Sequence, residues 1–294
     1  MVLEQRCFFN YIIPMIISAS RRCDIPRFKT DWLRERFDAG FADVANPFNS
    51  SQVKRVSLKP DDAGFLVFWT RDPGPLLNMR GILDSYPFYI MVTLTNYPEI
   101  FEPNAPRLDD VIRTMAEFSQ IWDPKRVIWR YDPVLLTSIT EISFHKKNFA
   151  NLAARLSGIT EKVIISIYDE YAGAKRRLAV LEKENKIAVF PHCQADGSLQ
   201  QEISDLLSEL VLISKKAKME IQSCAEKDLA VPGISRGACI DGNLIDEILK
   251  AENKPAFPAI RDKNQRSGCL CVQSVDIGSY GACPAGCVYC YGRR

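Results

Sequence analysis

The sequence predicts an α/β fold, specifically a parallel (β/α) barrel of the TIM type, from three observations. Short apolar runs rich in β-branched residues alternate with longer amphipathic stretches, as they do in consecutive βα units. Polar residues gather where the apolar runs end, and in a barrel these ends form the rim where active sites lie. The chain has 294 residues and is 47% hydrophobic, which is long for one ordinary domain but suits one barrel.

Eight apolar runs are predicted as strands: residues 15–20, 42–46, 65–70, 89–95, 126–131, 162–168, 220–223 and 272–277. Residues 187–190 are either a short extra strand or a loop, so the strand count stays open by one. The apolar stretch 7–19 resembles the core of a signal peptide. Because Asn10 and Pro14 interrupt it and it is too short to span a bilayer, we interpret residues 15–20 as a buried strand.

Five amphipathic stretches are predicted as helices: residues 31–39, 108–121, 144–157, 171–184 and 198–218. Asp109 and Glu202 lie near two of the predicted starts, which fits the preference of helix N-termini for acidic residues. The sequence shows no internal repeat and no low-complexity linker. We therefore expect a single barrel domain over residues 1–294, with a cysteine-rich section over residues 224–294 inside it.

The composition excludes several classes of protein. A net charge of +2, from 38 basic and 36 acidic residues, does not indicate a nucleic-acid-binding protein, although a local basic patch stays open. The two histidines, His145 and His192, are too few for a histidine-rich metal site or a histidine-based triad. The sequence has no further run of the roughly 18 apolar residues that a membrane helix needs, so we expect no membrane partner.

Three cysteines near the C-terminus are spaced as ligands of an iron-sulfur cluster. Cys283, Cys287 and Cys290 form a C-x3-C-x2-C run, and Pro284 and Gly286 indicate a loop that can wrap thiolates round a cluster. A [4Fe-4S] cluster is normally held by four thiolates, so three protein ligands leave one iron open to another molecule. Zinc and disulfides are the alternatives, but zinc sites usually come as C-x2-C pairs, and ten cysteines are too few for a disulfide scaffold.

Four further cysteines are candidates for a second centre: Cys224, Cys239, Cys269 and Cys271. Together they provide four thiolates, enough for a second [4Fe-4S] cluster with complete protein ligation. Buried structural thiols are the alternative, because lone cysteines are commonly buried and inert. We interpret Cys7, Cys23 and Cys193 as such ordinary residues.

The C-x3-C-x2-C run, with Tyr289 just before its last cysteine, resembles the signature of the radical S-adenosylmethionine (SAM) enzymes. In that superfamily the open iron binds the amino and carboxylate groups of SAM, and an electron from the cluster cleaves SAM to a 5′-deoxyadenosyl radical. The resemblance implies that Tyr289 packs near the adenine of SAM. Radical SAM proteins usually carry this loop after the first barrel strand, so its place after the last strand implies a circularly permuted barrel.

Polar residues at the predicted strand ends are the candidates for catalysis and cofactor binding. Guanidinium groups bind carboxylate or phosphate bidentately, so the arginines suit the carboxylate of SAM or an anionic substrate, while the acidic residues suit ribose hydroxyls or a substrate amine. The candidate catalytic residues are Arg21, Asp24, Arg130 and Asp132, and the candidate cofactor-binding residues are Arg22, Asn46, Arg71, Glu226 and Tyr289. A structural network of ion pairs is the alternative for each of them.

Nearly the whole chain is similar to a bacterial family of uncharacterised proteins, domain-of-unknown-function family 1848. The strings that carry the similarity are ISASRRCDIP from Ile17, NPFN from Asn46, VFWTRDP from Val67, VIWRYDP from Val127 and SVDIG from Ser274. The family is noted for a C-terminal cysteine cluster like the one found in radical SAM proteins. It implies no substrate.

These inferences favour a SAM-dependent radical enzyme that acts on an unknown substrate and is reduced by a donor such as flavodoxin or ferredoxin. An oxygen-sensitive cluster favours the cytoplasm. The alternative is a binding module, stabilised by an iron-sulfur cluster or zinc, that recognises a nucleic acid or a protein without catalysis. The basic residues of 261–266 and 293–294 give that alternative modest support.

Overall fold

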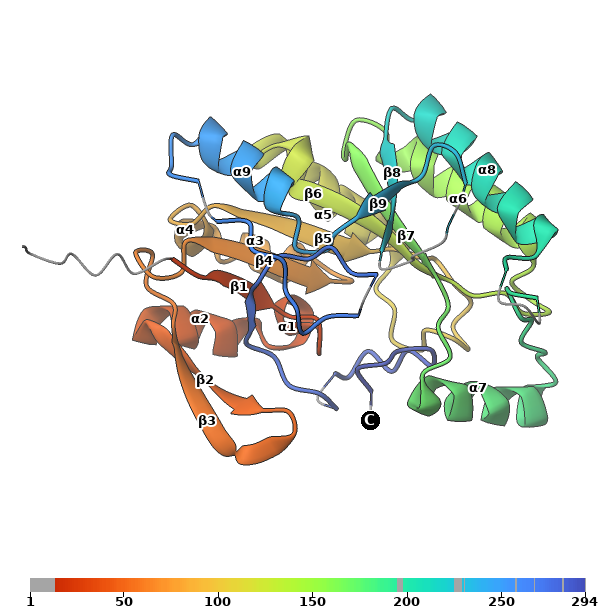
Figure 1. Ribbon diagram of the computed structural model, residues 1–294, viewed down its shortest axis with the longest axis horizontal. Coiled ribbons are helices and arrows are strands. Elements are labelled where there is room, and N and C mark those ends of the chain that lie inside the picture. Colours follow the sequence, from red (N-terminus) through yellow and green to blue (C-terminus); the bar gives the residue numbers. More distant parts are fainter. Residues whose placement is uncertain are drawn as a thin grey trace, which may run out of the picture.

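Eight parallel strands form the central sheet of the structure, a computed structural model that describes residues 14–194, 198–224, 229, 231–256, 258–266, 268–281 and 283–293. The strand order is β10-β1-β4-β5-β6-β7-β8-β9 (Figure 1). The strands are β1 (Ile16–Ala19), β4 (Phe65–Thr70), β5 (Phe88–Thr93), β6 (Val127–Val134), β7 (Lys162–Ile167), β8 (Glu220–Cys224), β9 (Ser235–Gly237) and β10 (Val275–Asp276). Seven of the eight predicted strands are confirmed as members of this sheet.

All five predicted helices are confirmed to within a few residues. They are α2 (Thr30–Ala39), α5 (Leu108–Ile121), α6 (Ile142–Leu156), α7 (Ala172–Asn185) and α8 (Gln201–Lys216). The described residues also contain α1 (Ile25–Phe28), α3 (Gly74–Leu77), α4 (Arg80–Leu83), α9 (Gly242–Ala251) and a single 3-10 turn, η1 (Pro124–Arg126). α9 was not predicted from the sequence, although Asp241 caps its start by accepting the N–H groups of Asn243 and Leu244.

Both faces of the sheet are buried, which explains why the strands are almost continuously apolar. Alternate side chains of each strand point to opposite faces. Phe68 and Ile90 pack in a core with α2 to α6 and α8, whereas Val67 and Met91 pack in a second core with α9. Cys239, Cys269 and Cys271 belong to this second core. Cys224 packs against the same core, so the four cysteines Cys224, Cys239, Cys269 and Cys271, here called the second cysteine set, lie on the α9 side of the sheet.

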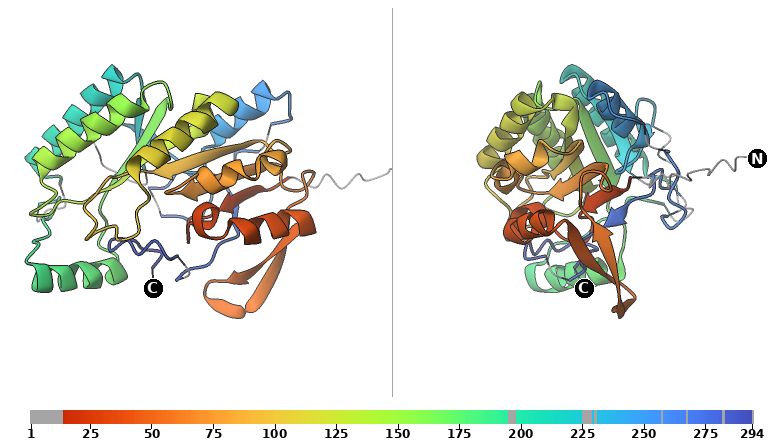
Figure 2. Two further views of the ribbon diagram at one scale, coloured as in Figure 1. Left: turned by 180° about the vertical axis from the view of Figure 1, so that it is seen from behind. Right: turned by 90° about the vertical axis from the view of Figure 1, so that its left-hand side faces the viewer.

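Residues 42–46 form a strand, but the prediction that they join the parallel sheet is wrong. β2 (Phe41–Asn46) pairs antiparallel with β3 (Asn49–Ser57), in a hairpin that projects from the rest of the molecule (Figures 1 and 2). The physical reason is the turn between them, where the side-chain oxygen of Asn46 accepts the N–H of Phe48 at 2.9 Å and the chain reverses. β9 is the eighth strand instead, and it escaped detection because it is only three residues long and partly exposed.

The edge strands of the sheet are β10 and β9, and no pairing joins them within the residues that the structure describes. The protein therefore has an α/β fold with a parallel eight-stranded sheet. Among the described residues, no strand pairing closes this sheet into a barrel. Residues 187–190 are a loop with one bridge, between Val189 and Thr137. Across the described ranges, no helix combines the length and the apolar character that crossing a membrane requires.

A buried histidine beside β6 gives a testable pH dependence. The Nε2 atom of His145 donates to the Leu135 carbonyl at 3.1 Å, and its Nδ1 atom accepts the Tyr131 hydroxyl at 2.9 Å. Both bonds suit a neutral ring, and burial lowers the pKa of His145 to about 4. As the pH falls, the unfolded chain, with a histidine pKa near 6.5, takes up a proton before the folded protein does. This histidine should therefore reduce stability by about 2 kcal/mol between pH 7 and pH 5.

Urea unfolding of the protein and of His145→Gln at these two pH values tests this expectation. The variant should be less stable at pH 7 but should lose less stability on acidification. Parallel pH dependences for the two proteins would contradict the assigned neutral state of His145.

Candidate functional site

A cavity of about 510 Å³ opens where the carboxyl ends of the parallel strands meet the C-terminal segment. It brings together most of the residues that the sequence predicted, namely Arg21, Arg22, Asp24, Arg71, Arg130, Asp132, Tyr289, Cys224, Cys239, Cys269, Cys271, Cys283, Cys287 and Cys290. Asn46 lies in the β2–β3 hairpin and is not part of the lining. Glu226 lies outside the described residues. Both cysteine sets thus face one space.

The cysteine loop that follows β10 is held by α7, and in Figure 1 the C-terminal segment lies near the end of α7 at which the helix begins. The guanidinium group of Arg177 on α7 donates to three carbonyl oxygens of the loop, those of Val288 (2.9 Å), Cys290 and Arg293 (3.0 Å). On another side, the amide of Asn104 donates to the Pro284 carbonyl at 2.9 Å. These hydrogen bonds go to backbone carbonyls and not to the cysteine side chains. They therefore hold the loop without occupying its thiols.

The thiols of the loop lie close enough to affect one another electrostatically. Burial raises the pKa of Cys287 to about 11, and the neighbouring thiols Cys290 and Cys283 act in the same direction. Burial also raises the pKa of Cys290, whose sulfur accepts the N–H groups of Gly292 and Arg293. Cysteine binds metal as the thiolate, so these thiols release protons when a metal binds.

Tyr289 joins a buried ion-pair network beside the loop. Arg71, at the end of β4, donates through both Nη atoms to the Glu102 carboxylate at 2.9 Å each. The Tyr289 hydroxyl contacts both partners, and the Thr95 hydroxyl also donates to Glu102. The ring of Tyr289 meets that of Tyr97 edge to face at 5.9 Å. Arg71 and Tyr289 therefore contact each other and Glu102, and both also line the cavity.

Asp276 lines the cavity but was not among the residues predicted for the site. It is the last residue of β10 and pairs with Ser18 of β1. Its carboxylate accepts four hydrogen bonds: from the hydroxyls of Ser18 and Ser20 at 2.7 Å, from the N–H of Arg21 at 2.8 Å and from the N–H of Gly278 at 2.9 Å. A side chain on Gly278 would collide with Ser20, because an added Cβ would lie 1.9 Å from its hydroxyl. The string SVDIG contained this aspartate and Gly278, but no local pattern revealed the other three partners, which are 255 to 258 residues away.

Of the four arginines predicted to bind anions, Arg21 and Arg22 are the most exposed. Their Nε atoms lie 3.9 Å from the Asp276 carboxylate, and their side chains are 20% and 19% exposed. By contrast, the side chain of Arg71 is 10% exposed, and both of its Nη atoms donate to Glu102. Of the predicted anion-binding residues, Arg21 and Arg22 are therefore the better placed to receive a carboxylate or phosphate.

Asp24 connects the loop after β1 with the end of β4. It caps α1 by accepting the Arg27 N–H at 3.1 Å, and it accepts the Arg71 N–H at 2.8 Å. Burial raises the pKa of Asp24 to about 6, partly opposed by these N–H groups and by the Thr70 hydroxyl. A carboxyl group that titrates near this pH is chemically suited to proton transfer.

The four other cysteines contact one another in a chain. The Sγ atoms of Cys224 and Cys239 are 3.0 Å apart, and Cys271 is hydrogen-bonded to both Cys239 and Cys269. Cys224 ends β8, Cys239 follows β9, and the C-x-C pair follows α9. Hydrogen bonds from Cys224 and Cys271 lower the pKa of Cys239, and the positive charge of Arg130 acts in the same direction.

Arg130 and Asp132, predicted as catalytic, form an ion pair in the cavity wall. The guanidinium group of Arg130 contacts the Asp132 carboxylate, which also accepts the Ser166 hydroxyl. The Nη1 atom of Arg130 lies 3.1 Å from Cys239 Sγ. Arg130 therefore links the second cysteine set to an acidic group of the cavity.

Both donor sets consist of thiols, which are ligands of iron-sulfur clusters and of zinc alike. Among the described residues, no three His, Cys, Asp or Glu side chains are arranged to hold one metal ion. In a [4Fe-4S] cluster each thiolate binds a different iron, so its ligands need not converge on one point. Thiolates are also the soft donors that iron-sulfur clusters select.

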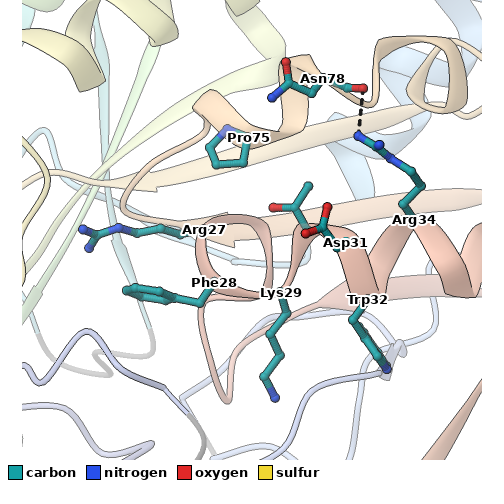
Figure 3. Close-up of a pocket in the computed structure, with 9 residues that line it drawn as sticks. Arg27, Phe28, Lys29, Asp31, Trp32, Arg34, Pro75 and Asn78 are labelled. Atoms are coloured by element: carbon teal, nitrogen blue, oxygen red, sulfur yellow. Dashed lines mark hydrogen bonds between the residues drawn. The ribbon is translucent and has the colours of Figure 1, made fainter.

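A second pocket, of about 410 Å³, lies beside α1, α2 and α3 and contains no cysteine in its lining (Figure 3). Its polar groups already serve the fold in part, since the Nη2 atom of Arg34 donates to the Asn78 carbonyl at 3.2 Å. We therefore assign the chemistry to the larger, cysteine-lined cavity.

Comparison with known proteins identifies a family. No curated protein matches the chain. Among solved structures, one assigned as an alpha-L-fucosidase from Bacteroides thetaiotaomicron has a TM-score of 0.28 and 12% identity over 92% of this chain and 94% of that chain. The crystal structure of HydG, a maturase of the [FeFe]-hydrogenase, has a TM-score of 0.27 and 10% identity over 82% of this chain and 63% of that one. Neither likeness is close enough to support an argument. Residues 16–292 match the profile of the family described as Domain of unknown function (DUF1848), and the chain therefore belongs to that family.

Proposed function

We propose that this protein is a radical SAM-type enzyme in which Cys283, Cys287 and Cys290 hold a [4Fe-4S] cluster that binds SAM. The observation that carries the proposal is that these three thiols line one cavity together with arginines at the carboxyl ends of parallel strands. Its volume of about 510 Å³ lies in the range of small-molecule sites. When bound and reduced, such a cluster supplies the electron that cleaves SAM to a 5′-deoxyadenosyl radical.

The residues of the chain bind and orient the reactants. Arg21 and Arg22 bind the carboxylate of SAM or an anionic group of the substrate, because guanidinium groups match such oxygens in pairs. Asp276 keeps both arginines beside the cavity. Arg71 and Tyr289 position the cysteine loop through Glu102. Asp24 holds or releases a proton near neutral pH.

The proposal includes a circularly permuted barrel, in which β10 is the first strand. β10, which precedes the cysteine loop, lies at the sheet edge next to β1. It occupies the place that a first strand would take if the chain began at β10. In this proposal the substrate enters at the carboxyl ends of the strands, and a cytoplasmic donor such as flavodoxin or ferredoxin delivers the electron.

Anaerobic reconstitution with iron and sulfide tests the function. The protein should gain the broad visible absorption of an iron-sulfur cluster, and after reduction it should convert SAM to 5′-deoxyadenosine. SAM should also change the electron paramagnetic resonance (EPR) spectrum of the reduced cluster, which is a readout independent of turnover. Replacing Cys283, Cys287 and Cys290 together with Ser should abolish both effects.

Cys193→Ser is the matched control, because Cys193 is partly buried but does not line the cavity. It should retain the SAM-dependent EPR change and SAM cleavage. Stoichiometric zinc, with SAM left intact and its addition without spectroscopic effect, would overturn the proposal.

A further inference from the structure

The second cysteine set has the composition and surroundings of an independent metal centre. We infer that Cys224, Cys239, Cys269 and Cys271 hold a [4Fe-4S] cluster with complete protein ligation, and that Arg130 tunes its reduction potential. Four thiolates are the usual complement of such a cluster, so no iron is left open to SAM or substrate. The site goes beyond the proposed SAM reaction and does not depend on it.

The fold gathers these four thiols from distant parts of the chain. Cys224 precedes β9 in the sequence and Cys239 follows it, and their Sγ atoms are 3.0 Å apart. Cys271 reaches Cys239 from the segment after α9. Lone structural cysteines pack against hydrocarbon, and nothing in their packing requires other thiols as neighbours. Four thiols gathered in one wall of a cavity provide the four thiolates that a [4Fe-4S] cluster requires, and the sulfurs separate from one another when each binds its own iron.

Hydrogen bonds to the sulfurs are already in place. The Ile240 N–H donates to Cys271 Sγ at 3.3 Å, and the Cys271 N–H donates to Cys269 Sγ at 3.4 Å. Hydrogen bonds of this kind, together with net charge and solvent exposure, set the potential of an iron-sulfur cluster. The backbone around the C-x-C pair is thus arranged to stabilise negative sulfur.

Arg130 supplies the compensating positive charge. Its Nη1 atom lies 3.1 Å from Cys239 Sγ, and it comes from β6, whose backbone is fixed by pairing on both sides. Cys239, Cys269 and Cys271 are each 7% exposed or less, so water screens this charge poorly. A positive charge held beside a cluster stabilises its reduced, more negative form and raises its reduction potential.

The decisive experiment uses the full chain in which Cys283, Cys287 and Cys290 are replaced with Ser. After anaerobic reconstitution it should retain about four iron and four sulfide per chain, as expected of one four-thiolate cluster. Its EPR spectrum after reduction should not respond to SAM. Adding Cys269→Ser and Cys271→Ser should remove this iron, whereas adding Cys193→Ser should not.

Retention of the iron without the C-x-C pair, or zinc in its place, would overturn the inference. Mössbauer spectroscopy of the unmodified chain provides a test that does not depend on the folding of variants. It should show two cluster environments, and a single environment that changes when SAM is added would count against the second centre. Because the triple serine variant cannot cleave SAM by the proposed mechanism, iron in that variant supports the second centre whether or not the proposed function survives.

Arg130→Met tests the tuning role in the triple serine background. Iron content should stay the same, and the midpoint potential of the remaining cluster should become more negative, with Arg130→Lys in between. An unchanged potential in Arg130→Met would show that this arginine serves only its ion pair with Asp132.

Discussion

Glu102→Gln should destabilise the protein by about 3–5 kcal/mol, because it removes one partner of a buried ion pair. The guanidinium group of Arg71 would stay buried without its countercharge, and the Tyr289 and Thr95 hydroxyls would lose a shared acceptor. Burial lowers the pKa of Arg71, and the negative charge of Glu102 is the main effect that opposes this and raises the pKa. Urea unfolding of the apoprotein measures the change.

An exposed ion pair provides the matched control. Arg113 and Asp110 on α5 lie 2.8 Å apart, but their side chains are 72% and 47% exposed, so Arg113→Gln should cost less than about 1 kcal/mol. The double variant Arg71→Met with Glu102→Leu should recover much of the loss, since no charge is then left buried. If Glu102→Gln costs as little as Arg113→Gln, the network does not hold the cysteine loop.

The helices and most strands could be predicted because each is determined by the spacing of apolar residues within its own segment. α5 matches its predicted limits since apolar residues recur at helical spacing after Asp109 and Asp110. The β2–β3 hairpin shows where this reasoning ends. Residues 42–46 have the composition of a strand, but composition does not tell which strand they pair with. Here the turn at Asn46 brings β3 beside β2, so β2 pairs with β3 and not with β1 or β4.

Some residues of the candidate site could likewise be predicted from local spacing, and others only from the folded structure. The terminal cysteines could be named because their ligand spacing is local, and the second set could be named only as four separate thiols. Their mutual contact depends on β8, β9 and α9, and two of these elements had not been predicted. Glu102 gave no signal at all, because a glutamate in a proline-rich loop resembles an ordinary surface residue until Arg71 is placed against it.

Asp276→Asn should destabilise the protein by about 2–4 kcal/mol, because an amide cannot accept the four hydrogen bonds that the carboxylate accepts. Each carboxylate oxygen receives one hydroxyl and one backbone N–H. The amide nitrogen that replaces one of these oxygens is itself a donor, and although the serine hydroxyl can rotate away, a backbone N–H cannot. One of the N–H groups of Arg21 and Gly278 is therefore left without an acceptor in a buried position.

The consequence reaches the cysteine loop because β10 is only two residues long and pairs only with β1 in the described structure. Hydrogen–deuterium exchange should accelerate in residues 16–22 and 275–279 and stay unchanged in β7 and β8. Asp61→Asn, at an exposed position, should leave both the exchange and the stability unchanged. If the terminal cysteines bind their cluster on this anchor, Asp276→Asn should also lose iron faster to a chelator, and retention at the normal rate would show that Arg177 and Asn104 suffice to hold the loop.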